Sequence, residues 1–165
     1  MSKVIEQLKE ALRQEIKLYQ AILDLAAQKT RLVIENHVRE LEKLTEKEQQ
    51  FIREMSRFEQ IRQSLLQHYA LEKELEEAPQ NLSGLLLFLQ KNEQQEVKDL
   101  RDKLANLVQQ ISEKNQLNEA LIQQSLDFIK LNIELLTQDD SATTPYDKKA
   151  DENKKQQKQL FDAKF

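Results

Sequence analysis

The chain has 165 residues, including one Gly, two Pro and no Cys, with 33% charged and 5% aromatic residues and a net charge of -4. This composition is typical of long, solvent-exposed helices, so we expect an elongated all-α protein. The missing cysteines exclude a disulfide framework, the mixed charges leave no basic stripe for nucleic acid, and no apolar run approaches the ~20 residues that cross a membrane. Without an amino-terminal signal, we expect a cytoplasmic protein.

The first segment, residues 2–76, contains neither Gly nor Pro, and its apolar residues recur every three or four positions. Unbroken, such a helix would be roughly 110 Å long, and it would need a partner along its length. The apolar stripe shifts phase around residues 31–37, which indicates a bend or stutter there. Its first half carries Val4, Leu8, Leu12, Ile16, Tyr19, Leu23 and Ala26.

The second half of this segment steps by alternating three and four residues, the spacing of a left-handed coiled-coil seam. Two of its positions are charged, Glu48 and Arg62. A functional role is one interpretation, but charged seam residues more often pair across a hairpin and fix its register. The seam consists of Leu41, Leu44, Glu48, Phe51, Met55, Phe58, Arg62, Leu65 and Tyr69.

A turn is predicted at "EEAPQNLSG", residues 76–84, because Pro79 disfavours helix before it and Asn81 and Ser83 can cap a new one. The apolar run at residues 85–89 could touch a membrane, but without a basic flank we expect it to be core beneath the turn. A second amphipathic segment follows, so the simplest arrangement is an antiparallel hairpin or coiled-coil bundle of long helices, one of them broken into shorter rods.

The stretch "NQLNEALIQQSLDFIKLNIELL", residues 115–136, places Asn118, Ser125 and Asn132 seven residues apart within an apolar arc of roughly 200°, about twice that of an ordinary surface helix. Such a helix must touch elements on two sides. One is expected to be the amino-terminal helix, and the other either a further rod of this chain or an amphipathic helix of a partner. The candidate binding residues are Leu117, Leu121, Ile122, Phe128, Ile129, Leu131, Leu135 and Leu136.

The last segment, residues 139–165, is nearly devoid of apolar residues and cannot offset its ordering entropy. We therefore expect one helical domain at residues 1–138 and a disordered, flexible C-terminal tail able to fold on binding. Its few large apolar residues are candidate tail contacts: Tyr146, Leu160, Phe161 and Phe165.

No catalytic or metal-binding motif is found. A di-iron carboxylate site needs Glu-x-x-His pairs, but Ile34 and Leu65 precede His37 and His68 by three residues. The single Gly84 excludes phosphate-binding glycine loops. We expect a protein that is not an enzyme and has no metal or cofactor.

Two stretches resemble the FlgN-type flagellar export chaperones: "LYQAILDLAAQKTRLVIENHVRELEKLTEKEQQFIREMSRFEQIRQ" and "NQLNEALIQQSLDFI". The resemblance covers most of the chain up to Leu136. It implies a cytoplasmic type III export chaperone that binds the terminal helices of the hook-associated proteins FlgK and FlgL, prevents their premature assembly and delivers them to the export gate. The matching residues are Tyr19, Leu23, Lys29, Leu41, Leu44, Glu48, Gln49, Glu59 and Arg62.

The same apolar arc has an alternative use. A structural coiled-coil adaptor or self-associating spacer would bury it in a homodimer.

Overall fold

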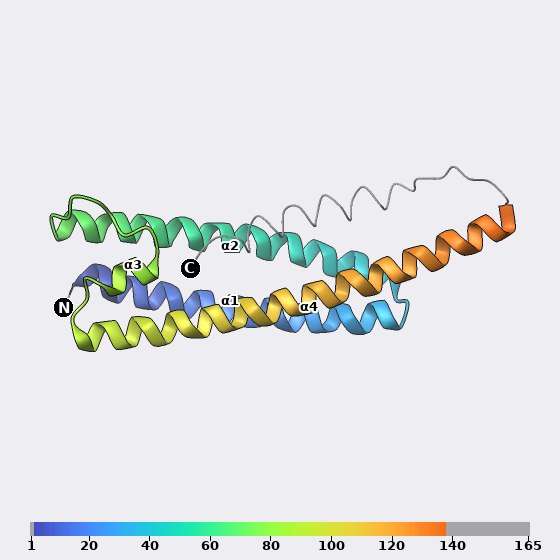
Figure 1. The fold of residues 1–165 in the computed structure, drawn as a ribbon, viewed down its shortest axis with the longest axis horizontal. Helices are drawn as coiled ribbons and strands as arrows, with labels where there is room; N and C mark the ends of the chain where they lie inside the picture. Colours follow the sequence, from blue (N-terminus) through green and yellow to red (C-terminus); the bar gives the residue numbers. More distant parts are fainter. Residues whose placement is uncertain (1, 138–165) are drawn as a thin grey trace.

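The computed structural model describes residues 2–137, and within them it contains four helices and no strand. They are α1 (Lys3–Ile34), α2 (Val38–Glu72), α3 (Leu82–Leu86) and α4 (Lys91–Thr137). Three long rods lie side by side in an elongated bundle (Figure 1). The all-α, elongated architecture predicted from composition is confirmed, whereas the predicted tail lies outside the described residues.

The first segment is broken where its apolar stripe shifts phase. Residues 35–37 reverse the chain so that α1 and α2 form an antiparallel hairpin (Figure 1). Asn36 has a positive φ of 59°, a conformation that asparagine tolerates better than most residues. The amides of Asn36 and His37 donate to the carbonyls of Val33 and Leu32, the two bonds of a Schellman cap. The long helix therefore ends at a defined cap.

The second helix ends in the same way. Glu74 has a φ of 52°, its amide donates to Leu71, and the amide of Leu75 donates to Ala70. The predicted turn follows, and α3 begins where the side chain of Asn81 accepts a hydrogen bond of 2.8 Å from the amide of Gly84. Gly84 has no positive φ, so the turn does not require its special freedom.

The apolar run beneath the turn is only partly core. Leu85 is fully buried together with Leu82, but Leu87 and Phe88 are 83% and 50% exposed. The prediction of a buried cluster is therefore wrong for these two residues. They follow the end of α3 and lie on the outside of the connection into α4, because the short helix has one face available for packing against the bundle.

The central rod is α1, which packs against both α2 and α4, while α3 covers the beginning of α4. Both α1 and α4 run in the same direction, antiparallel to α2 (Figure 1). Residues at seven-residue steps on α4 face α1 and are fully buried, as in a coiled-coil seam. The largest completely buried apolar residues of the core are Ile5, Leu8, Leu12, Leu66, Leu82, Leu85, Val97, Leu104 and Ile111.

Candidate partner-binding surface

Two polar contacts fix the register of α1 against α4. The buried Lys9 amine lies 2.6 Å from a carboxylate oxygen of Glu96 and also pairs with Glu6, and these hydrogen bonds raise the pKa of Lys9. Farther along, the Thr30 hydroxyl donates to the Asn118 side chain, an offset of 88 residues. With that offset, the last residue of α1, Ile34, is level with about Ile122. The rest of α4 extends past the end of α1.

We call residues 123–137 the α4 overhang. At 1.5 Å per residue it is about 22 Å long. Figure 1 shows it leaving the bundle where α1 turns into α2. Every residue from Asp127 to Thr137 is exposed, in a stretch rich in large apolar side chains. Among the described residues, none covers this part of the helix.

Six of the eight candidate binding residues are exposed to solvent. The half-buried exceptions, Leu121 and Ile122, lie beside the last turn of α1. Ile133, which is 39% exposed, belongs to the same surface and was absent from the candidates. Its position on the apolar arc was the signal that could have identified it. The exposed candidates are Leu117 (44%), Phe128 (65%), Ile129 (50%), Leu131 (52%), Leu135 (71%) and Leu136 (84%). The tail candidates Tyr146, Leu160, Phe161 and Phe165 lie outside the described residues.

The row of short polar residues changes its environment along the helix. Asn118 is buried, and its amide donates a bond of 2.9 Å to the carbonyl of Ala26 on α1. The amino-terminal helix is therefore one of the two neighbours of this stretch, as expected. Ser125 is half-buried and Asn132 is exposed. The same row of residues therefore begins in the α1–α4 interface and ends on the solvent-exposed overhang.

The two charged seam residues of α2 both pair with α1. Lys29 lies 2.9 Å from Glu48, and Arg62 lies 3.3 Å from Glu15. Glu15 and Lys29 are 14 residues, or two heptads, apart on α1, and their partners on α2 are the same distance apart. Both ion pairs therefore fit a single antiparallel register of the two helices. The interpretation of Glu48 and Arg62 as register-setting residues agrees with this geometry, and neither residue is part of the overhang.

Among the carboxylic acids in the described part of the chain, Glu15 has the most strongly shifted pKa. Its carboxylate is fully buried, and Arg62 at 3.3 Å is longer than a strong charge-assisted bond. Burial raises the pKa of Glu15 to about 7, and the Arg62 charge opposes this shift only in part. Burial also raises the pKa of the neighbouring Tyr19. The α1–α2 contact thus contains a proton-sensitive group.

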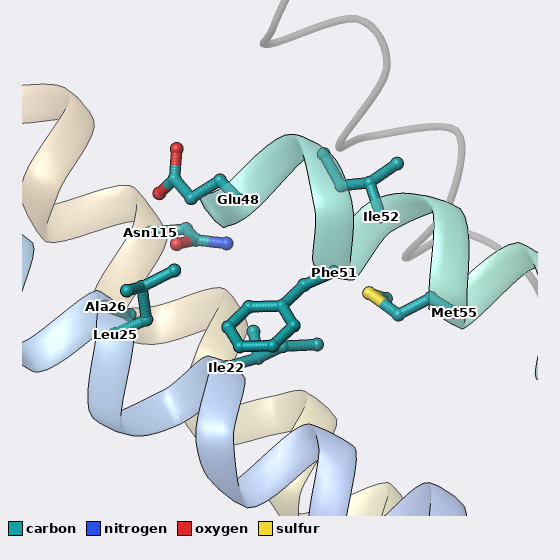
Figure 2. Close-up of a pocket in the computed structure, with 8 residues that line it drawn as sticks. All are labelled: Ile22, Leu25, Ala26, Glu48, Phe51, Ile52, Met55 and Asn115. Atoms are coloured by element: carbon teal, nitrogen blue, oxygen red, sulfur yellow. The ribbon is translucent and has the colours of Figure 1, made fainter. Parts of the chain in front are cut away.

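A small hollow lies where the three long helices meet. Figure 2 shows Phe51 and Met55 of α2 directed toward Ile22 of α1, with Asn115 of α4 at the end of the hollow nearer Glu48. Its cavity of about 30 Å³ has room for about one water molecule and no organic ligand. The hollow is therefore a small packing space among the three helices.

Within residues 2–137, no group of three or more His, Cys, Asp or Glu side chains is placed to hold a metal ion. No helix there is both long and apolar enough to cross a membrane.

A family model described as FlgN protein matches residues 1–154 of the chain. The chain belongs to the FlgN family. This confirms the resemblance seen in the sequence and identifies the protein as a flagellar export chaperone. Searches of curated proteins and of solved structures found no match. The α4 overhang projects from the bundle with exposed apolar side chains, and exposed apolar surfaces of this kind often bind other proteins.

Proposed function

We propose that the protein is a cytoplasmic, non-catalytic chaperone that holds the terminal helices of the hook-associated proteins FlgK and FlgL on the α4 overhang. One observation carries this proposal. The overhang continues the heptad of a packed helix but lacks the helix that would cover it among the described residues. Holding the client helices there keeps them from assembling early and leaves the complex ready for delivery to the export gate.

The free energy available from burying the exposed apolar residues is compatible with client binding on the overhang. Each Leu, Ile or Phe buried by a client contributes roughly 1.5–3 kcal/mol, while association costs about 4–15 kcal/mol. Three anchoring residues would barely offset that cost. The exposed large apolar residues of the overhang, together with Leu117, supply more than twice that number of possible anchoring residues.

A titration of the full chain with peptides of the carboxy-terminal helices of FlgK and FlgL tests the proposal. We expect binding by calorimetry in the micromolar range or tighter, and weaker binding by at least about tenfold after Leu135→Asp and Leu136→Asp together. A matched control is Gln116→Asp, which adds a charge to an exposed position on the opposite, polar face of the same helix. Absence of binding at tens of micromolar contradicts the proposal.

The same surface could instead join two copies of the chain. Sedimentation of the free protein separates these uses. A tight dimer that the double Asp variant dissociates would assign the overhang to self-association, as in a structural adaptor or spacer. A monomer that binds the client peptides supports the chaperone function.

A further inference from the structure

The α4 overhang exposes apolar side chains around much more of its circumference than one partner helix can cover. We define an inner stripe on the side that faces α1 and α2 within the bundle, and an outer stripe on the other side of Asn132; both begin shortly before the overhang and continue along it. The inner stripe consists of Ile122, Leu126, Ile129, Ile133 and Leu136. The outer stripe consists of Leu117, Leu121, Phe128, Leu131 and Leu135.

The inner stripe continues an interface that the bundle already uses. Asn115, seven residues before Ile122, lines the hollow shared with α1 and α2 (Figure 2). The turn between α1 and α2, residues 35–37, lies where α4 leaves the bundle (Figure 1). On either side of this turn, Ile34 and Val38 are 67% and 58% exposed. A helix placed on the inner stripe would therefore meet an apolar end of the bundle.

The outer stripe has no counterpart within the bundle. Farther back on the same side of α4, the exposed residues are polar: Lys103, Asn106, Gln110 and Glu113. From Leu117 onward this side is apolar except for Gln124, although α1 still runs alongside α4 at the level of Leu117. Leu117 is nevertheless 44% exposed, so the bundle leaves a large part of its side chain uncovered. This change in character marks a surface that internal folding does not require.

We infer that the overhang binds a pair of amphipathic helices, one on each stripe, both supplied by the same client. Together the stripes span roughly 200° of the helix, and a single packed helix covers about 100°. A second copy of α4 would cover only one stripe. The chain after Thr137 contributes only four large apolar residues, Tyr146, Leu160, Phe161 and Phe165. A helix pair is the occupant whose width matches the uncovered arc.

This inference rests on the proposed function, and its test uses three probes with the full chain. The probes are a peptide of the carboxy-terminal helix of FlgK, a peptide of its amino-terminal helix, and one chain that joins both by a flexible Gly/Ser linker. We expect the joined pair to bind at least about tenfold more tightly than either peptide alone, because the second contact becomes intramolecular.

Two neighbouring substitutions assign the stripes. Phe128→Glu disrupts the outer stripe and Ile129→Glu the inner stripe, while Gln116→Glu, at an exposed position on the polar face opposite both stripes, is the control. Each single peptide should lose binding with only one of the two variants, and the joined pair should lose about tenfold or more with either. A single peptide that is sensitive to both variants and gains nothing from joining overturns the two-helix arrangement but leaves the proposed function standing. Failure of all three probes to bind overturns both.

Discussion

The two parts of α4 have the same heptad rhythm and opposite surroundings. Along the bundle, Val97, Leu104, Ile111 and Asn118 face α1 and are almost completely buried. Past the end of α1, the same helix exposes apolar residues over its last three turns. The difference shows that the pattern of a helix specifies a face for packing, while the lengths and register of its neighbours decide whether that face is covered.

The largest expected difference between the two parts concerns stability. Leu104→Ala should lower the free energy of unfolding by about 2–5 kcal/mol, because Leu104 is fully buried and its truncation leaves a cavity. Leu135→Ala, at a 71% exposed position, should change it by less than about 0.5 kcal/mol. Urea denaturation followed by circular dichroism measures both. Equal losses would mean that the overhang is already covered in the free protein.

The second prediction concerns the proton-sensitive contact of the bundle. The folded-state pKa of Glu15, about 7, lies above its ordinary value of 4.5. The folded state therefore binds the proton more tightly than the unfolded state, and the associated stability is complete below about pH 4.5 and lost as the pH rises through 7. At about 1.4 kcal/mol per pKa unit, this loss is roughly 3 kcal/mol.

Glu15→Gln tests this assignment because Gln is neutral at every pH. The variant should be more stable than the wild type at pH 8 by roughly the same 3 kcal/mol and should match it near pH 4.5. Exposed Glu10→Gln is a suitable control for a general loss of negative charge on α1. A variant that is less stable than the wild type at pH 8 would show that the Arg62 charge outweighs the burial of Glu15.

A smaller effect is expected along the polar row of α4. Asn118→Ala should cost about 1–3 kcal/mol, because it removes the buried bond to Ala26 and the contact with Thr30. Asn132→Ala, one step beyond the bundle, should be nearly neutral since Asn132 is exposed. Thermal unfolding of the two variants checks the comparison. Similar losses in both would contradict the different environments assigned to this row.

The smallest effect on stability should accompany the largest effect on function. Leu135→Asp should leave the free energy of unfolding unchanged within about 0.5 kcal/mol, because a charge at a mostly exposed position costs little in the free protein. Binding of the client peptides should nevertheless weaken, since the aspartate would be buried against an apolar helix. Unfolding by urea and binding by calorimetry, performed on the same preparation, separate the two effects.

Much of the fold follows from local pattern. The heptad spacing predicted the α2 seam, and the phase shift predicted a bend or stutter near Ile34, where the structure has a complete reversal of the chain. The charged positions of the seam were expected to pair across a hairpin with its turn at residues 76–84, whereas Glu48 and Arg62 pair with α1 across the reversal at residues 35–37. The exposure of Leu87 and Phe88 was not predictable, because an apolar run specifies a tendency to bury and not how many of its members the short α3 can bury.

The site was predictable as a helix face but not as a free surface. Ile111, Asn118, Ser125 and Asn132 follow one another at the same spacing, and nothing in that spacing distinguishes the covered members from the uncovered ones. The distinction arises from where α1 ends relative to α4, which depends on long-range contacts such as Thr30 with Asn118. The domain boundary at residue 138 and the role of the tail stay predictions.

Hydrogen exchange of the α4 backbone, with and without a bound client, tests the central claim most directly. In the free protein, amides of the overhang should exchange much faster than those between Val97 and Asn118, because no described helix packs over them. The joined client helices should slow exchange in residues 123–137 strongly and leave the bundle almost unchanged. An overhang already protected in the free protein, or one whose exchange the client does not alter, would contradict the assignment of this surface to client binding.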